Sequence, residues 1–401
     1  MKPQRLLLTA FGDPGHAFPA IALGRELAAR GHEVCLETWD RWQEDVEREG
    51  MAFAPAPEYE VWPRPGLTPY QAAVRAAGET AALIERTDPA VVVADILTVA
   101  GGLAAQMTGR RWATLIPHVY PVTESGMAPY SSGARIPRTR AGTAFWSLFD
   151  RALVRGAERG RRELNGARER VGLGPLEHIH GGISPQLALV GTFPQLEYPR
   201  HEVSPALRVT GPLLWERPAE AAEPPPGDEP LVLVAPSTSQ DPDQRMVRAA
   251  LAGLAAEPVR VLATLNHRPS PVPLDVPANA RVVDWLSYAR TMPLCDAVVC
   301  HAGHGTVVRA LASGVPVVGC PSAGDMAENA ARLAWSGCGV SLPRRFVTPR
   351  GVRTAVRKLL ADPGYAQRAG ELGAWAARHD GAALAADAVE ELALARTGDR
   401  D

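Results

Sequence analysis

A motif rich in histidine and glycine, His-Ala-Gly-His-Gly-Thr at residues 301–306, follows directly after the apolar run Ala297–Cys300. The run is typical of the buried end of a parallel strand, and the apolar residues after Thr306 recur with helical spacing. A strand, a glycine turn and a helix N-terminus together form a cradle for an anion, because the first amides of a helix lack partners and its dipole is positive there. The motif lacks the lysine of a phosphate loop and the third glycine of a dinucleotide fingerprint. We expect a phosphorylated ligand here, the alternative being a tight turn that binds nothing.

Two flanking segments carry side chains that suit the other parts of a sugar nucleotide. Trp285, at the end of an apolar run, offers a flat ring on which a base can stack. Asp325, in the loop after the strand expected at 314–318, can accept hydrogen bonds from sugar hydroxyls. A base, a diphosphate and a sugar would thus be bound in chain order.

The run 285–329 resembles the donor-binding signature of family 1 glycosyltransferases, in the bacterial branch of the GT-B fold that modifies antibiotics and other natural products. The resemblance implies that the base stacks on Trp285, that His301 contacts the diphosphate, and that Asp325 binds the transferred sugar. The turn 303–306 would supply the phosphate cradle, in which His304 could equally serve only to shape the turn. The donor-binding residues expected on this basis are Trp285, Leu286, His301, Gly303, His304, Gly305, Thr306, Asp325 and Met326.

The loop after the expected strand 231–235 contains Ser237 and Thr238, whose hydroxyls could reach the diphosphate from the opposite side. A turn that caps the following helix is an equally good interpretation. Asp241 and Asp243 mimic an Asp-x-Asp metal motif, but we interpret them as charge at a helix N-terminus, because the cradle already neutralises phosphate. No metal site and no cofactor are therefore expected; the nucleoside-diphosphate sugar is a substrate.

Three positions depart from the family pattern. Met326 stands where many members have a glutamine after the sugar-binding aspartate, and Tyr288 stands where many have a glutamine three residues after the tryptophan. Arg309 occupies the position at which one branch has a glutamate that holds the ribose. The loss of these contacts leaves open which sugar is transferred and whether the donor is a UDP- or a dTDP-sugar.

The expected catalytic pair is His16, in the loop after the first strand, and Asp95, at the end of a later strand. A histidine has a pKa near neutrality and can act as a general base, although a lone loop histidine is more often structural. Asp95 could equally be a helix N-cap. The resemblance implies that His16 takes the proton of the acceptor and that Asp95 orients its ring. We expect an inverting displacement in which the acceptor oxygen attacks the anomeric carbon.

The acceptor site is expected in two long loops of the first half, around 62–70 and 119–137, which are rich in Pro, Gly, Ser and aromatic residues. Aromatic rings there favour a lipophilic acceptor such as a polyketide or a flavonoid-like compound, but rings are just as common in ordinary cores. The acceptor-binding residues expected are Phe11, Trp62, His118, Tyr120 and Phe145. His118 could equally be a buried, satisfied histidine.

The elements that must position these residues alternate between strand and helix, which predicts parallel sheets covered on both faces. Apolar runs at 5–10, 33–37, 91–94 and 113–116, with weaker ones at 186–190 and 207–209, predict a first sheet. The pattern restarts at 231–235 after a proline-rich stretch. We expect the GT-B architecture: an acceptor-binding Rossmann-like domain at 1–214, a linker at 215–230, a donor-binding Rossmann-like domain at 231–378, and a helix within 379–401 that crosses back to the first domain. Ligands would bind in the cleft at the carboxyl ends of the strands.

The chain has 401 residues and a formal net charge of -2, which suits two domains and gives no reason to expect nucleic acid or an anionic membrane as partner. No apolar run approaches the ~20 residues that span a bilayer, and the N-terminus does not read as a signal peptide. The five cysteines are not spaced as metal ligands, and they suit free thiols in a reducing compartment, so a cytoplasmic protein is expected. A monomer or a homodimer is expected as well.

Two other function classes fit the same architecture less well. A sugar-nucleotide epimerase or hydrolase would not need the expected base or the long acceptor loops. A non-catalytic auxiliary protein would not need to keep a base. An oxidoreductase is disfavoured because the dinucleotide fingerprint after the first strand is missing.

Overall fold

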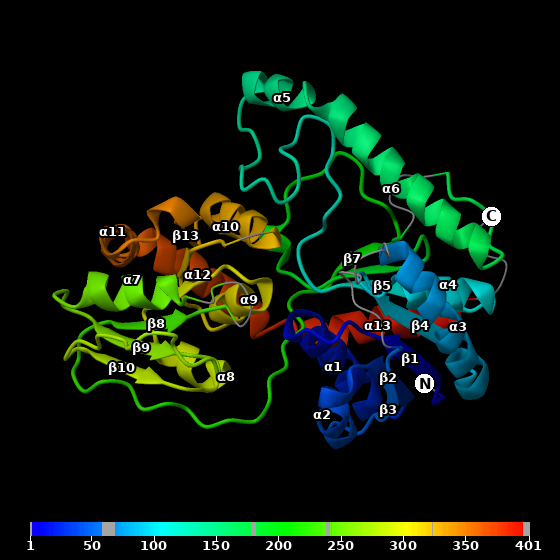
Figure 1. Cartoon of the computed structure of the whole chain (residues 1–401), viewed down its shortest axis with the longest axis horizontal. Helices are drawn as coiled ribbons and strands as arrows, with labels where there is room; N and C mark the ends of the chain where they lie inside the picture. The colour runs from blue at the N-terminus through cyan, green and yellow to red at the C-terminus, as the bar shows by residue number, and fades with distance from the viewer. Residues whose placement is uncertain are drawn as a thin grey trace.

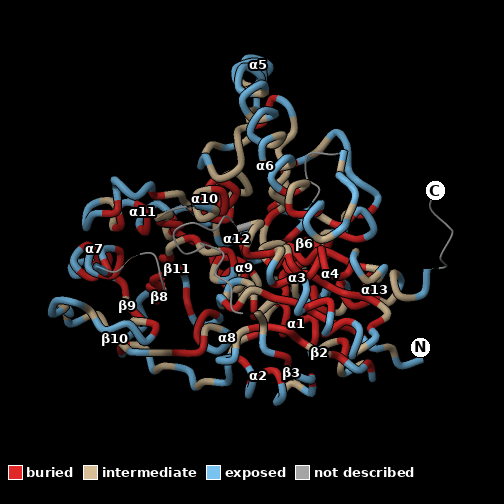
Figure 2. The backbone as a smooth tube through the Cα atoms, turned by 45° about the vertical axis from the view of Figure 1, so that its right-hand side comes forward, coloured by how far each residue is buried: buried red, intermediate tan, exposed pale blue. Residues whose placement is uncertain are grey.

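The computed structural model describes residues 2–57, 69–177, 182–237, 241, 243–322 and 324–395. In this part of the chain the strands form two parallel sheets, one in each half of the sequence, with helices packed against both (Figure 1). Buried residues concentrate in the strands and in the helices beside them (Figure 2).

The first sheet has seven strands in the order β3-β2-β1-β4-β5-β6-β7. The strands are β1 (Arg5–Thr9), β2 (Glu33–Thr38), β3 (Ala52–Pro55), β4 (Val91–Asp95), β5 (Arg111–Ile116), β6 (Ala188–Val190) and β7 (Leu207–Val209). The helices of this half are α1 (Pro14–Ala29), α2 (Gln43–Arg48), α3 (Pro69–Thr87), α4 (Val99–Met107), α5 (Arg140–Ser147) and α6 (Asp150–Arg170). All five residues of β4 are buried, as expected for a central parallel strand covered on both faces.

The second sheet has six strands in the order β10-β9-β8-β11-β12-β13. The strands are β8 (Leu231–Ala235), β9 (Arg260–Thr264), β10 (Ala280–Val283), β11 (Ala297–Cys300), β12 (Val317–Gly319) and β13 (Gly339–Ser341). The helices are α7 (Arg245–Leu254), α8 (Tyr288–Thr291), α9 (His304–Ala312), α10 (Asp325–Ser336), α11 (Pro349–Ala361), α12 (Pro363–Ala376) and α13 (Gly381–Leu394).

Each sheet reverses its strand order at one place, between β1 and β4 in the first and between β8 and β11 in the second. In parallel sheets a ligand binds beyond the carboxyl ends of the strands at such a switch point. His16 and Asp95 follow or end the two strands at the first switch point, whereas Ser237 and His301 follow the two at the second. The topology therefore places the expected catalytic and phosphate-binding residues where ligands belong.

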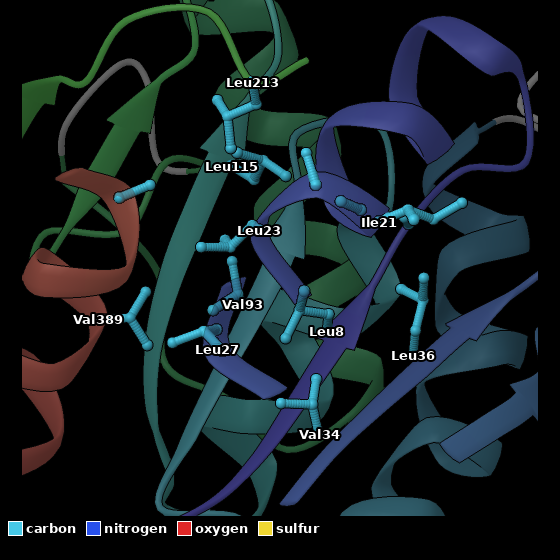
Figure 3. Packing of buried hydrophobic residues seen from close by; sticks show 14 of the residues in the cluster. Leu8, Ile21, Leu23, Leu27, Val34, Leu36, Val93, Leu115, Leu213 and Val389 are labelled. Carbon is cyan, nitrogen blue, oxygen red and sulfur yellow. The ribbon is translucent and has the colours of Figure 1, made fainter. Parts of the chain in front are cut away.

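The last helix returns to the first sheet. Val389 of α13 packs in one apolar cluster with Leu8, Leu23, Leu27 and Val93 (Figure 3). Polar contacts beside this cluster fix the same helix: Nε2 of His32 lies 2.9 Å from Oε1 of Glu390, and Arg30 pairs with Asp387 at 2.6 Å. The expected crossing of the C-terminal helix is confirmed.

The expected fold class, two Rossmann-like parallel sheets in the GT-B arrangement, is likewise confirmed, and the weak strand signals at 186–190 and 207–209 correspond to β6 and β7. The structure adds an edge strand, β3, and a helical arm, α5 and α6, which projects from the molecule (Figure 1). In the described residues no helix is both long and apolar enough to cross a membrane.

Candidate active site

His16 lies in the first turn of α1, because Asp13 and Pro14 begin the helix directly after β1. Its Nδ1 is 2.8 Å from Oδ1 of Asp95, and the side chain of Asp95 is completely buried. A carboxylate only accepts, so Nδ1 carries the hydrogen and Nε2 is the atom that can take a proton. Burial opposes protonation of His16, but the charge and hydrogen bond of Asp95 outweigh it and raise the pKa of the imidazole above its ordinary 6.5.

Three further side chains surround this pair. The ring of Phe11 lies edge-on to His16 at 6.0 Å between centroids, and the ring of His118 lies at 6.4 Å. Nδ1 of His118 donates to the carbonyl oxygen of Val119 at 2.8 Å, which leaves its Nε2 as a hydrogen-bond acceptor. Burial lowers the pKa of His118 and keeps it neutral. The hydroxyl of Tyr130 lies 3.4 Å from the same Nδ1. The segment 119–137 therefore contributes a side chain to the surroundings of His118.

The turn expected to bind the diphosphate leads into α9. Gly303 is the N-cap of this helix, and no side chain caps it, so the first amides remain open to a ligand. A Cβ at Gly303 would lie only 2.2 Å from Nε2 of His301, which shows that the imidazole packs directly over the glycine. Burial lowers the pKa of His301. A Cβ at Gly305 would meet nothing within 4 Å, so this side of the turn is open.

His304 has a different environment from the one the motif suggested. It is buried, its Nε2 lies 3.2 Å from the carbonyl oxygen of Gly191 in the first half, and its Nδ1 lies 3.4 Å from Oδ1 of Asn329. Burial lowers the pKa of His304 to about 4. Its observed contacts join the two halves of the chain, which fits the alternative that it only shapes the turn.

Trp285 follows β10 and stacks on His267, with ring centroids 4.8 Å apart and planes inclined by 5°. Sequence reasoning gave His267 no role. His267 follows β9, the strand next to β10, and its Nδ1 lies 2.5 Å from Oδ2 of Asp284. His267 and its neighbour Asn266 both have positive φ, 59° and 51°, so the turn that presents this imidazole to Trp285 is strained.

All three departures from the family pattern have hydrogen-bond partners in the structure. The hydroxyl of Tyr288 donates to Oδ1 of Asn266 at 3.1 Å, so it supports the strained turn beside Trp285. Arg309 donates to the carbonyl oxygen of Trp215 at 2.7 Å and ties α9 to the segment that connects the sheets. The Sδ of Met326, in the first turn of α10, accepts a hydrogen bond at 3.1 Å from the hydroxyl of Ser322, which precedes this helix.

Asp325 begins α10 and faces the first half of the chain. Its negative charge favours the charged form of both His16 and His118, but this effect is smaller than that of burial, which opposes the charged form of both. The same charge adds to the burial that raises the pKa of Tyr130. The residue expected to hold the sugar therefore lies across from the residue expected to act as base.

The remaining expected residues are less closely grouped. Leu286 is buried in the core of the second half, and Ser237 is buried beside β8. The amide of Tyr120 donates to Glu197, and its ring lies under the guanidinium of Arg200. Phe145 is half-exposed on α5, which projects from the molecule (Figure 1), and its ring contacts those of Trp146 and Phe149. Trp62 and Thr238 lie outside the described residues.

Asp241 acts as expected at a helix N-terminus, since its two carboxylate oxygens accept from the amides of Arg245 and Met246 in α7. Within the described ranges, no group of three or more His, Cys, Asp or Glu residues is arranged to hold a metal ion.

Taken together, the two parallel sheets with their switch points and the C-terminal helix that returns to the first sheet are the arrangement of the GT-B fold. Residues 246–392 match the model of the C-terminal domain of erythromycin biosynthesis protein CIII-like proteins, and residues 6–119 match the N-terminal domain of glycosyltransferase family 28. The chain is 32% identical to 4'-demethylrebeccamycin synthase of Lentzea aerocolonigenes, over 98% of this chain and 100% of that protein.

Solved structures share the fold. The glycosyltransferase of kitacinnamycin superposes with a TM-score of 0.79 at 22% identity, over 98% of this chain and 100% of that one. Glycosyltransferase SsfS6 of Streptomyces sp. SF2575, complexed with thymidine diphosphate, superposes with a TM-score of 0.67 at 20% identity, over 97% and 99% of the two chains. The chain thus belongs to the EryCIII-like natural-product glycosyltransferases, which use nucleotide-sugar donors.

Proposed function

We propose that the protein transfers a sugar from a dTDP- or UDP-sugar to a hydroxyl of a lipophilic natural product, with inversion at the anomeric carbon. The observation that carries this proposal is the 2.8 Å contact between His16 and Asp95 at the first switch point. A thymidine diphosphate complex of a protein with the same fold supports a dTDP-sugar as the first donor to test.

In the proposed reaction the acceptor hydroxyl donates to Nε2 of His16. As the acceptor oxygen attacks the anomeric carbon, its proton moves to Nε2 and the bond from this carbon to the diphosphate oxygen breaks. Asp95 stabilises the imidazolium that forms, and the first amides of α9 take up the negative charge of the departing nucleoside diphosphate. Attack from the side opposite the leaving group inverts the configuration.

The donor is then held by three parts of the second half. The base stacks on Trp285, the diphosphate lies on residues 303–306, and the carboxylate of Asp325 accepts hydrogen bonds from the sugar. On the other side, Phe11, His118 and Tyr130 provide an apolar wall with one imidazole nitrogen, Nε2 of His118, as hydrogen-bond acceptor for a lipophilic molecule. Trp62, Tyr120 and Phe145 remain expected acceptor-side residues.

The test is a panel of nucleotide sugars, scored by the rise in melting temperature, followed by acceptor screening with the best stabiliser. A ligand that binds only the folded state raises the melting temperature by mass action. We expect one base and one sugar to stand out, and transfer to give a product of inverted anomeric configuration by NMR. Release of free sugar without transfer to any acceptor would instead support a hydrolase.

A further inference from the structure

A buried ionic network lies where α10 meets the first half of the chain. Glu328 and Arg332 are four residues apart on α10, and Nε of Arg332 donates to Oε1 of Glu328 at 2.9 Å. The same guanidinium donates to Oε2 of Glu197 at 3.1 Å and to the carbonyl oxygen of Leu196 at 2.8 Å. The side chains of Arg332 and Glu328 are only 3% and 5% exposed, so this is not a solvated surface pair.

Both carboxylates of the network also accept a backbone amide from the segment 120–131. Oε1 of Glu197 accepts from the amide of Tyr120 at 2.7 Å, and Oε2 of Glu328 accepts from the amide of Ser131 at 3.3 Å. One arginine thus holds two carboxylates, and each carboxylate holds one end of the same loop. We call residues 120–131 the acceptor loop.

The two ends of the acceptor loop are attached to different halves of the molecule. Near Tyr120 the loop is held within its own half, because Arg200 donates to the carbonyl oxygens of Tyr120 and Val122. At the other end Ser131 has a φ of 64°, a left-handed conformation that a non-glycine residue adopts only when its surroundings hold it. Glu328 is the group that accepts the amide of this residue, and it belongs to the donor-side helix.

The position of Glu328 connects the loop to both substrates of the proposed reaction. It lies one turn after Asp325, the residue expected to hold the sugar. Ser131 directly follows Tyr130, whose hydroxyl lies 3.4 Å from His118 beside the proposed base. A shift of Ser131 would therefore move Tyr130 in the acceptor wall, whereas the diphosphate cradle on α9 would keep its place.

We propose that Glu328, held by Arg332, is a positioning residue that fixes the acceptor loop to the donor-side helix and thereby shapes the acceptor site. The part of this inference that concerns acceptor binding rests on the proposed function, whereas the attachment of the loop does not. Burying two charged partners costs desolvation energy, so stability alone is a weak reason for such a network.

The experiment compares Glu328→Ala, Glu328→Gln and a matched control, Glu390→Ala, by hydrogen exchange and by kinetics. Like Glu328, Glu390 contacts a buried basic residue from a distant segment, in this case His32. This contact joins α13 to the residue before β2, and it involves no residue of the acceptor loop. In Glu328→Ala we expect the amides of 120–137 to exchange at least tenfold faster and the acceptor KM to rise at least tenfold. The affinity for thymidine diphosphate is expected to stay within threefold.

Glu328→Gln keeps an oxygen that can accept the Ser131 amide and should recover most of the acceptor KM. Glu390→Ala should lower the melting temperature without changing either readout. Unchanged exchange of 120–137 in Glu328→Ala would overturn the attachment, and faster exchange with an unchanged acceptor KM would overturn the positioning role.

The exchange measurement also separates this inference from the proposed function, because it needs no turnover. If the wild-type protein transfers nothing, the proposed function fails while exchange still decides whether Glu328 holds the loop. Should Glu328→Ala not fold, Glu328→Asp provides the test, because its shorter side chain withdraws the carboxylate from the Ser131 amide. Faster exchange of 120–137 is expected, and unchanged exchange would count against the inference.

Discussion

At the residue scale, four histidines gather around the two switch points, and their surroundings separate their roles. Burial lowers the pKa of His118, His301 and His304 and keeps their imidazoles neutral. Only His16 has a buried carboxylate as partner, and its pKa is raised in spite of its own burial. The structure therefore singles out His16 as the imidazole best able to accept a proton.

Replacing His16, the proposed general base, should remove most of the transferase activity. His16→Ala loses general base catalysis, which contributes about 100- to 10,000-fold, so we expect kcat to fall within this range while thymidine diphosphate still binds. Steady-state kinetics together with calorimetric titration of the nucleotide provide the measurement. Retention of more than a tenth of the wild-type kcat would show that His16 is not the base.

The pH dependence follows from the direction of the shift. His16 must be neutral to accept a proton, so the rate should fall as the pH drops through a raised pKa above 6.5. Asp95→Asn removes the negative charge, the largest cause that raises this pKa, and leaves at most a weaker hydrogen bond to a neutral amide oxygen. In that variant the acidic limb of the pH–rate profile should move to lower pH, while the maximal rate also falls because the imidazolium loses its stabilising charge. An acidic limb at the wild-type position would contradict the assignment.

Gly303 should be intolerant of any side chain. Gly303→Ala places a methyl group 2.2 Å from Nε2 of His301, so the imidazole must leave the cradle. We expect the affinity for thymidine diphosphate to fall about tenfold or more, which corresponds to about 1.4 kcal/mol. Gly370→Ala in α12 is the control, because its new methyl group meets nothing within 4 Å. Equal nucleotide affinity in the two variants would show that the close packing of His301 over Gly303 is not needed to bind the diphosphate.

At the element scale, the sequence predicted what depends on local pattern. The apolar runs predicted strands in both sheets but missed the edge strand β3. The contact between His16 and Asp95 was expected from the resemblance to family 1 glycosyltransferases, and both residues lie at the carboxyl edge of the first sheet. Two features were missed because they depend on which segments become neighbours. His267 reaches Trp285 only because β9 lies beside β10. Glu328 and Arg332 resemble an ordinary surface pair until α10 is packed against 196–198.

The packing of α13 provides a prediction at this scale. Val389 is fully buried between α13 and the first sheet, so Val389→Asp buries an unpaired charge. The free energy of unfolding should fall by roughly 4 kcal/mol or more, measured by denaturant titration. Leu394→Asp on the same helix is the control, since Leu394 is 62% exposed and should change stability by less than about 0.5 kcal/mol. Similar stabilities for the two variants would mean that α13 does not pack as described.

At the scale of the whole molecule, the polar contacts between the two halves include three made by side chains of α9 and α10. His304 contacts Gly191, Arg309 contacts Trp215, and Arg332 contacts Glu197, and each of these pairs joins a residue of the second half to a segment before β8. These side chains belong to α9 and α10, the helices that carry the expected donor-binding residues, and they contact connecting segments of the first half. If donor and acceptor bind as proposed, these contacts fix the two sites relative to one another.

The proposed chemistry uses helix amides to stabilise the leaving diphosphate, so a divalent metal should not be required. We expect the transfer rate to change by less than twofold when the protein is treated with EDTA and assayed without added metal. Addition of Mg²⁺ or Mn²⁺ to the treated protein serves as the complementary measurement. A rate that is lost with EDTA and restored by either ion would show that the amides alone do not stabilise the leaving group.

The central claim is that a nucleoside diphosphate rests on residues 303–306 with its terminal phosphate directed across the cleft toward His16. A crystal structure of the protein with thymidine diphosphate tests it most directly. Our account predicts the thymine ring on Trp285, phosphate oxygens on the amides of the first turn of α9, and the terminal phosphate on the side of this turn that faces the His16–Asp95 pair. A nucleotide bound elsewhere, or one whose terminal phosphate points away from His16, would contradict it.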